Sequence, residues 1–398
     1  MTGNGSQASP YIVMDAYDFN SLRTLINTSG SYPYVELGDD IDMSVYPVFT
    51  QFPTSYCNFD GKNHRIYNLN ISTANASAST GLFGSLYAAQ VKNIFIEGSI
   101  TAAETGSYGV GMLAGYLYFG TIDAKVSNIH CSGAIVIQNF SSMGKVGGIC
   151  GNLQNSNSSN TNAALENCSF HGTITGRMTY SITSINDQMP YIGGIAGWMD
   201  TYSGASGVPV SITKCISNVT VVIDSSTAHM GVGGIVGLLR SYSGKLVTVD
   251  RCISQMEVHI ATAAASPRTL CIGGIAAYSY YSTSNISRCA AHLVFQYDLP
   301  STIAAVYFAG ILAYYSAACN ISQSYSVMSI NNPNNKPLPA AFYVDGIQGN
   351  GTRTITASFY DAEVLAASFS GSVVDSSRGI TTAEMKSQAF LESQGWVF

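Results

Sequence analysis

The 398-residue chain is long enough for two or three ordinary domains or for one long repeat array. Hydrophobic residues make up 46% of the chain but charged residues only 10%, against about 25% in typical globular domains, and this balance excludes disorder. The net charge of −6, with 17 Lys and Arg residues, leaves no basic patch for phosphates, so nucleic acid is excluded as an expected partner.

The first 57 residues predict an N-terminal cap with a short helix and the first strands. Residues 1–6 lack both the positive and the apolar region of a signal peptide. A strand is expected over Pro10–Val13, followed by an amphipathic helix over residues 15–27. A cap is needed because an uncovered terminal coil would expose apolar side chains and open strand edges.

A tetrapeptide of the form small–apolar–x–small recurs eight times in residues 58–357. Its copies begin at Gly81, Met112, Gly148, Gly194, Gly234, Gly274, Gly310 and Gly346. Successive starts differ by 31 to 46 residues, a spacing typical of solenoid repeats. Glycine is expected here because the backbone either bends sharply or closely approaches another wall.

Two further β-type runs follow each tetrapeptide, so each repeat is expected to hold three runs joined by Ser, Gly and Asn turns. One begins as Val91-Lys-Asn-Ile94, and the other alternates, as in residues 219–223. Because every repeat is alike, each strand can stack on its counterpart in the next coil. The sequence therefore predicts one interior file made of Ile149, Ile195, Ile235 and Ile275.

Four of the nine cysteines recur at one position of the second run: Cys168, Cys215, Cys252 and Cys289. Neighbours in this column could approach within disulfide range, but a buried thiol also behaves as a small hydrophobe, and free core thiols are the preferred interpretation. No Cys-x-x-Cys pair is present and the six histidines are scattered, so no metal site is expected and no cofactor is implied.

The apolar segment of residues 304–319 could be mistaken for a membrane span. It is shorter than the about 20 residues that a bilayer requires. It also falls in register with a repeat, so strands are expected there and membrane insertion is not.

Residues 358–398 predict a C-terminal cap. Thr381-Thr-Ala-Glu384 has the pattern of a capping box ahead of a helix over Met385–Leu391, and residues 395–398 are expected to close the last coil. The whole chain is thus predicted to be all-β: a single-stranded right-handed parallel β-helix, or β-solenoid, of about eight coils with short helical caps at both ends. The handedness is an expectation from the preference of parallel crossovers.

The repeats resemble those of the GLUG-motif proteins, which are named after a Gly-Leu-x-Gly tetrapeptide seen here as Gly81-Leu-Phe-Gly84. The likeness extends to the opening segment of residues 5–13 and to the closing run from Ser358 to Phe398. Such modules occur in secreted bacterial adhesins, beside immunoglobulin A protease domains and in bacteriophage virion proteins. The resemblance implies display and binding, and it brings no catalytic residues.

The absence of an export signal favours a phage protein over the secreted members of this family. The leading expectation is a non-enzymatic virion surface protein, a tail fibre or another receptor-binding or structural component on the phage tail or capsid exterior. Its expected partners are a host cell-surface glycan or receptor and other virion proteins, and a homotrimer would suit a fibre. Two alternatives stay open: a module of a secreted or cell-surface bacterial adhesin, and a polysaccharide-degrading tailspike.

Paired carboxylates on neighbouring coils, as glycoside hydrolysis requires, do not appear when the repeats are aligned. Glu166 and Asp250 share a repeat position, but Thr213 lies between them and Arg251 is adjacent. We interpret them as solvated ion-pair partners and predict no catalytic residue.

Aromatic residues follow the tetrapeptides and are expected to form a band along one face. Its members are Tyr116, Tyr118, Trp198, Tyr202, Tyr242, Tyr278, Tyr280, Tyr281, Tyr314 and Tyr315. Flat rings with a polar tip can stack on sugars at small entropic cost, so the band is the candidate glycan-binding site. The alternative is that the rings cover coil corners, stack on one another or lie in an oligomer interface.

Overall fold

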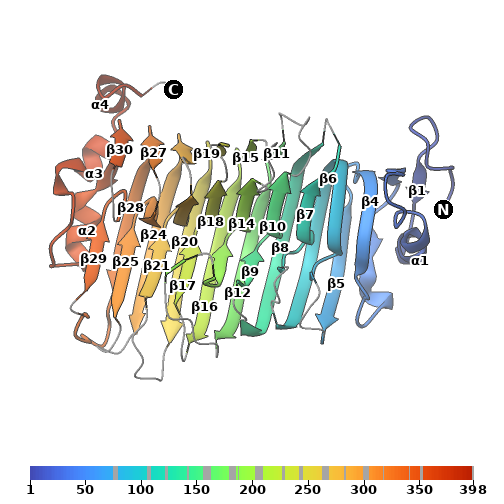
Figure 1. Cartoon of the computed structure of the whole chain (residues 1–398), viewed down its shortest axis with the longest axis horizontal. Coiled ribbons are helices and arrows are strands. Elements are labelled where there is room, and N and C mark those ends of the chain that lie inside the picture. Colours follow the sequence, from blue (N-terminus) through green and yellow to red (C-terminus); the bar gives the residue numbers. More distant parts are fainter. Residues whose placement is uncertain are drawn as a thin grey trace.

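The chain forms an elongated all-β fold of parallel sheets, with one end of the chain at each end of the molecule (Figure 1). One sheet has 26 strands and the other has six. The structure is a computed structural model that describes residues 1–74, 79–104, 109–121, 124–140, 143–155, 163–178, 185–186, 188–201, 209–225, 229–241, 245–261, 269–281, 284–298, 304–316, 318–339, 341–349 and 353–396. All structural statements below concern these residues.

From residue 145 to residue 331, each coil supplies one strand to each of four rows, and strands within a row pair in parallel. The last coil, which ends at residue 361, adds strands to the first, third and fourth rows. The first row is the six-stranded sheet: β9 (Lys145–Gly147), β13 (Tyr191–Gly193), β17 (Met230–Gly233), β21 (Thr269–Gly273), β25 (Ala305–Ala309) and β29 (Phe342–Asp345). The second row holds β10 (Cys150–Asn155), β14 (Ala196–Thr201), β18 (Val236–Ser241), β22 (Ala276–Tyr281) and β26 (Leu312–Tyr315). The third holds β11 (Ala164–Glu166), β15 (Val210–Thr213), β19 (Val247–Asp250), β23 (Ser284–Ser287), β27 (Cys319–Ser322) and β30 (Arg353–Thr356). The fourth holds β12 (Ser169–Met178), β16 (Ile216–Ser225), β20 (Ile253–Ala261), β24 (Ala290–Asp298), β28 (Tyr325–Asn331) and β31 (Phe359–Asp361).

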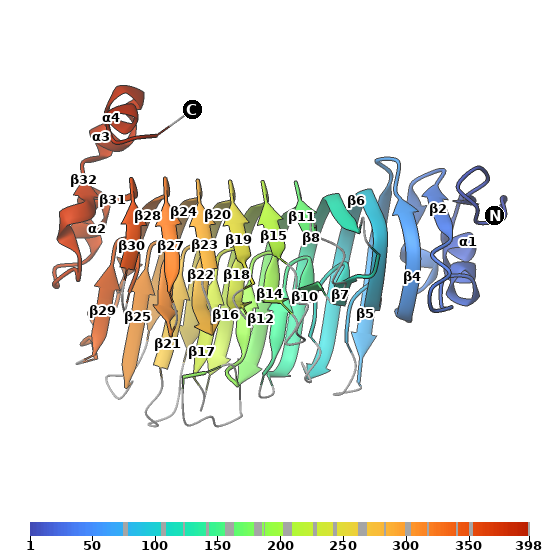
Figure 2. The same cartoon turned by 45° about the horizontal axis from the view of Figure 1, so that its top comes forward.

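The same rows continue toward the N-terminus in longer strands. These are β4 (Phe52–Asp60), β5 (Arg65–Thr73), β6 (Phe83–Glu104), β7 (Ala114–Phe119) and β8 (Lys125–Phe140). Before them, β1 (Tyr11–Val13) pairs in parallel with β2 (Tyr34–Leu37), which pairs with β4, and β3 (Ile41–Asp42) pairs with β5. The strands therefore stack in parallel from the first ordered segment of the chain onward, as Figure 2 shows from a second direction.

The predicted interior file is confirmed. The amide of Ile149 donates to the carbonyl of Ile195 at 2.9 Å, and the amide of Ile195 donates in the same way to the carbonyl of Ile235. Ile235 repeats the contact with Ile275, and all four side chains are fully buried in one hydrophobic core. Matching segments of successive coils thus lie directly over one another.

The tetrapeptide differs from the prediction in one respect: its first two residues form a bend between two strands, and its last two residues begin the second of these strands. Gly194 and Ile195 separate β13 from β14, so each coil from Lys145 to Asn331 has four strands. The bend pushes the backbone against the opposite wall, because a Cβ at Gly194 would lie 1.9 Å from Oγ of Ser217 on β16. Gly193 is equally confined, since a Cβ there would meet the carbonyl oxygen of Ala196 at 1.9 Å. Glycine is thus required by close approach on both sides of the corner.

The cysteine column also forms as expected, with all nine thiols free and buried. The Cys215 Sγ lies 3.4 Å from the amide of Cys168 and donates to the carbonyl of Thr213 at 3.3 Å. Burial raises the pKa of the thiols of Cys215, Cys252 and Cys289 well above the usual value. These groups are therefore protonated packing residues.

Short helices lie at both ends of the chain. Helix α1 (Ala16–Ser21), capped by Asp15, is shorter than the predicted 15–27 because a 3-10 turn replaces it over Leu22–Thr24. Its Phe19 ring packs 5.2 Å from the ring of Phe52 on β4. The helix therefore lies against the first strands of the 26-stranded sheet.

At the C-terminal end, α2 (Ala362–Ser368) begins after Asp361, and no sequence signal had indicated it. The predicted capping box between Thr381 and Glu384 is present, but the helix it opens, α3 (Thr382–Met385), is brief. Strand β32 (Gly379–Ile380), which precedes α3, lies beside Tyr360 and Asp361, and α4 (Gln388–Ser393) follows α3. Trp396 packs 5.8 Å from the ring of Tyr325 in the last coils.

The apolar segment of residues 304–319 contains β25 and β26, as the repeat register predicts. In the described part of the chain, no helix is both long enough and apolar enough to cross a membrane.

Replacing Gly194 with Ala is expected to destabilise the protein by about 3 kcal/mol, because the new methyl group overlaps both Ser217 and the carbonyl oxygen of Gly234. Gly30→Ala is the control: Gly30 has a φ of 78° but nothing within 4 Å, so only backbone strain of about 1 kcal/mol is expected. Chemical denaturation of both variants measures the difference. An equal decrease in the free energy of unfolding in the two variants would show that the corner does not contact the opposite wall closely.

Candidate functional site

The outward side chains on the two sides of the tetrapeptide bend converge, and we call the surface they form the outer corner. It comprises the outward residues of the six-stranded sheet and of the row from β7 to β26. The ring of Tyr191 on β13 lies 6.1 Å from that of Trp198 on β14, and Tyr307 on β25 lies 4.8 Å from Tyr314 on β26. The structure therefore brings most of the predicted aromatic band together, at a concave corner.

Near the N-terminal end of the outer corner, tyrosines stack in a ladder. The ring of Tyr118 lies 4.5 Å from that of Tyr87 and 4.1 Å from that of Tyr116, and the planes are nearly parallel. Tyr56 extends the ladder at 4.7 Å from Tyr87, and all four rings are half-buried. Sequence reasoning missed Tyr56 and Tyr87, although Tyr87 has the same offset from Gly81 as Tyr118 has from Met112.

A second tyrosine group occupies the C-terminal end of the outer corner. Tyr280 and Tyr314 are half-buried and contact Tyr278, while Tyr281 is about half exposed. Tyr307 joins them and stacks on Tyr343 at 5.0 Å. Burial, with the neighbouring Tyr314 and Tyr343, raises the pKa of Tyr307 to about 12. Tyr191, Tyr307 and Tyr343 were missed because they precede the tetrapeptide, each by the same three residues.

Three members of the predicted band are packing residues in this arrangement. Trp198 and Tyr278 are 0% and 2% exposed and belong to a small second core under the outer corner, while Tyr315 points into the main core. A ring without exposed surface has no face to offer a sugar. Tyr202 and Tyr242 lie outside the described residues.

Charged side chains surround Trp198 in the middle of the outer corner. The ammonium of Lys145 lies 4.3 Å from the Trp198 ring centroid, and the guanidinium of Arg240 lies 4.4 Å from it. Arg240 also pairs with Asp200 at 2.5 Å, and both Lys145 and Asp200 are buried. Cations desolvated over an indole ring interact favourably with it, so this cluster stabilises the corner between the two tyrosine groups.

A second surface, which the sequence did not single out, follows the third strand row. Its outward residues form one file in parallel register: Glu36, Asp60, Lys92, Ser127, Glu166, Thr213, Asp250, Ser287, Ser322 and Thr356. We call this file, with the five further cations that contact its carboxylates, the polar strip. Those cations are Lys62, Lys125, Lys214, Arg251 and Arg288.

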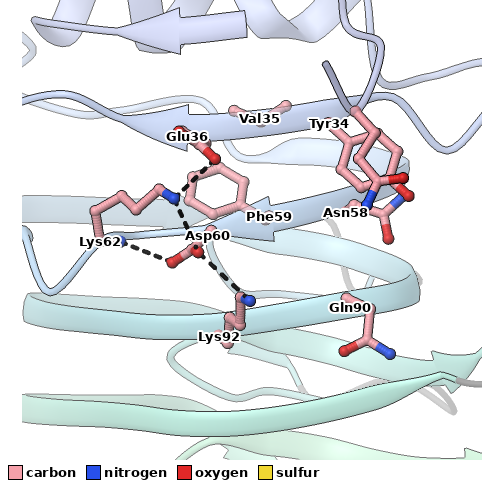
Figure 3. Close-up of a pocket in the computed structure, with 10 residues that line it drawn as sticks. Tyr34, Val35, Glu36, Asn58, Phe59, Asp60, Lys62, Gln90 and Lys92 are labelled. Carbon is pink, nitrogen blue, oxygen red and sulfur yellow. Dashed lines mark hydrogen bonds and ion pairs between the residues drawn. The ribbon is translucent and has the colours of Figure 1, made fainter. Parts of the chain in front are cut away.

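A cavity of about 440 Å³ opens at the N-terminal end of the polar strip (Figure 3). On one side Asp60 is held between the ammonium groups of Lys62, at 3.4 Å, and Lys92, at 3.5 Å. Burial alone would raise the pKa of Asp60, but the Lys62 amide, Asn93 and the two lysines outweigh it and hold that pKa below its usual value. The other side of the cavity presents Tyr34, Asn58 and Gln90 (Figure 3).

A second cavity, of about 480 Å³, lies further along the polar strip around Glu166. Lys125 and Lys214 both pair with this carboxylate, Lys214 at 2.9 Å. Hydrogen bonds from these two lysines lower the pKa of Glu166 to about 2. Asn128 and Asn167 complete the polar lining.

Asp250 repeats the arrangement two strands further along. It is held by Arg251 at 2.9 Å and Arg288 at 2.6 Å, and Ser287 donates to it at 2.7 Å. Its burial would raise its pKa, but the hydrogen bonds from Arg288, Ser287 and Arg251 outweigh that effect and lower the pKa. The interpretation of Glu166 and Asp250 as ion-pair partners is thus confirmed, but Asp250 is buried and not solvated.

From Lys92 to Ser287, the residue that follows each strip position has a left-handed backbone: the φ values are 57° at Asn93, 55° at Asn128, 51° at Asn167, 54° at Lys214, 52° at Arg251 and 52° at Arg288. Asparagine tolerates this conformation, and Asn128 donates to Asn93 at 2.8 Å in a short side-chain ladder. Later coils have Lys and Arg at the same position, which places these cations beside the strip carboxylates. The signal that could have revealed the strip was the presence of acidic and basic residues at adjacent repeat positions, as in Asp250-Arg251.

The chain is similar to known proteins in its fold. No family model matches the chain, and no curated protein is similar to it. Among solved structures, the chain is similar to a candidate immunoglobulin A1 protease from Bacteroides ovatus, with a TM-score of 0.51 and 19% identity over 87% of this chain and 86% of that one. At this identity the likeness shows a shared fold alone.

Across the described residues, no group of three or more His, Cys, Asp or Glu side chains is arranged to hold a metal ion.

Trp198→Ala is expected to destabilise the protein by about 3 to 5 kcal/mol, because a fully buried indole leaves a large cavity. The control is Tyr17→Ala: its ring is 65% exposed, and a change within about 0.5 kcal/mol is expected. Thermal unfolding measures both, and a wild-type melting temperature for Trp198→Ala would contradict the packing described here.

The ion pairs of Glu166 predict a pH-dependent stability. Its pKa in the folded protein, about 2, lies below the ordinary value of 4.5, so its stabilisation is fully present above pH 4.5 and is lost as the pH falls toward 2. Because the lysines are exposed, Glu166→Gln should lower the free energy of unfolding at neutral pH by only about 1 kcal/mol. Urea denaturation of both proteins between pH 7 and 2 should show this difference vanishing, and a constant difference would count against the ion pairs.

Proposed function

We propose that this protein is a non-enzymatic surface protein of a bacteriophage virion, a tail fibre or another receptor-binding or structural component, and that its outer corner binds host cell-surface glycan. The observation that carries the proposal is the pair of tyrosine groups at the two ends of the outer corner. Their rings keep part of their surface exposed while neighbouring rings hold them in place, and the ammonium of the buried Lys145 lies 5.8 Å from the Tyr116 ring centroid. Rigid aromatic surfaces of this kind bind sugars at low entropic cost.

The proposal includes the finer architecture. It takes the fold as a right-handed solenoid of about eight coils, with α1 and α2 to α4 acting as caps that block strand pairing at the ends. Residues 1–57 and 358–398 would then serve as caps around a repeat region of residues 58–357. A fibre of this kind would assemble with other virion proteins, as a homotrimer in the simplest arrangement.

The state of the strip carboxylates supports a binding role over a hydrolytic one. Glycoside hydrolysis needs one carboxyl group with a raised pKa that can donate a proton. The pKa values of both Glu166 and Asp250 are lowered, so both are ionised at neutral pH and neither can serve as a general acid. The polysaccharide-degrading tailspike is therefore the weakest of the candidates.

A bacterial adhesin module is the second candidate function, favoured by the bacterial source of the Bacteroides ovatus neighbour. In an adhesin, the same outer corner would bind glycan, whether the protein stands on the bacterial cell surface or is secreted. The protease activity in that neighbour's description is not carried over, because the likeness is one of fold.

A glycan array with the wild type and a Tyr118→Ala, Tyr343→Ala double variant tests the binding role. These residues represent the two tyrosine groups, so we expect at least about a tenfold loss of affinity with little change in melting temperature. Tyr17→Ala removes an exposed ring outside the outer corner and should bind as the wild type does. Unchanged binding by the double variant would remove the outer corner as a glycan site.

Mass spectrometry of purified phage particles separates the two candidates, since only a virion component is recovered with the particle. Release of oligosaccharides from host capsule by the pure protein would contradict the non-enzymatic role.

A further inference from the structure

We propose that the polar strip is a second binding site, which takes a linear acidic polysaccharide lying along the long axis of the molecule. It is a different surface from the outer corner, and the inference does not depend on glycan binding there. It rests on three repeated carboxylate clusters in one file, on the exposure of the cations around them and on the cavities at the first two clusters.

Three carboxylates of the polar strip are each held between two cations. Asp60 lies between Lys62 and Lys92, Glu166 between Lys125 and Lys214, and Asp250 between Arg251 and Arg288. The file runs from Asp60 to Glu166 in three strand steps and from Glu166 to Asp250 in two, which correspond to about 14 Å and about 10 Å. The clusters thus repeat along the direction in which the coils stack.

The cations, and not the carboxylates, face the solvent. The side chains of the six cations are 43% to 49% exposed, whereas those of Asp60, Glu166 and Asp250 are 16%, 24% and 7% exposed. An ammonium group has three donors, and a guanidinium five, so each retains donors for a ligand after pairing with its carboxylate. A ligand that approaches the polar strip therefore meets positive groups held in fixed positions.

The strip is also positive in a chain that is negative overall. Its six cations and four carboxylates, including Glu36, give a net charge of +2, against −6 for the whole chain. The remaining surface repels polyanions, so an anionic polymer is directed to this strip.

The chemistry between the charges favours a sugar polymer. The two cavities are lined by hydroxyl and amide groups, including Tyr34, Asn58, Gln90, Ser127 and Asn167, which can pair with sugar hydroxyls. The centres of the clusters, at their carboxylates, lie about 10 to 14 Å apart, with Ser127 and Thr213 among the residues between them, which suits a polymer with acidic groups at intervals. A nucleic acid carries a phosphate on every nucleotide, and the carboxylates beneath the strip would repel so dense a charge.

The test measures binding of the full chain to oligogalacturonate, hyaluronan and polysialic acid, each beside its methyl-esterified form, by calorimetry. We expect at least one acidic polymer to bind and its ester to bind at least about tenfold more weakly, with an affinity that falls as salt is added. Single-stranded DNA is the probe for non-specific polyanion binding and should bind more weakly than the acidic sugar.

Lys125→Gln combined with Lys214→Gln removes one cluster's cations and should weaken binding about tenfold. Lys386→Gln, which removes an exposed charge near the C-terminus, is the matched control and should change affinity less than twofold. Tyr118→Ala should leave this binding unchanged, which separates the polar strip from the outer corner. The proposal would be overturned if no acidic polymer bound, or if an ester bound as tightly as its acid. Tighter binding of DNA, or wild-type affinity in the double lysine variant, would also overturn it.

Discussion

The register of the parallel stacking is the constraint on which the rest of the structure depends. Each coil donates backbone hydrogen bonds to the next at the same repeat position, as from Ile149 to Ile195 to Ile235. Once that register is set, every side chain has its counterpart one strand spacing away, about 4.8 Å. Packing, ring stacking and ion pairing therefore depend on which residues occupy the equivalent repeat position in the neighbouring coils.

The same rule explains why the two candidate surfaces look so different. On the outer corner, residues of the same type occupy one repeat position and stack on one another, as Tyr87 does on Tyr118. The bend also brings the side chains of a second strand row against those of the first. On the polar strip, unlike residues at one offset pair, as Lys92 does with Asp60. The bend is possible because its glycines allow the backbone to touch the opposite wall, so the concave corner is a direct product of the tetrapeptide.

The period and phase of the repeats made the fold predictable from the sequence, and the interior file and the free cysteine column followed from them, while the capping box at Thr381 followed from its local pattern. The first strand row, the six-stranded sheet before the tetrapeptide, was not predicted, because a tetrapeptide with one apolar residue looks like a short strand until the opposite wall is known. The aromatic band was placed on the correct side of the bend, but offsets alone could not show that Trp198 is covered while Tyr281 is open. The polar strip was missed because each of its carboxylates pairs with a cation from a neighbouring coil, as Glu166 does with Lys125 and Lys214, so a single repeat does not display a whole cluster.

The column of protonated thiols has a consequence for where such a protein can exist. Cys215, Cys252 and Cys289 are sealed from solvent, and their raised pKa values leave almost no thiolate to react with oxidants or other disulfides. Oxidation of these cysteines therefore does not stabilise the described fold, and reducing conditions do not weaken it. Its folding therefore does not require an oxidising compartment.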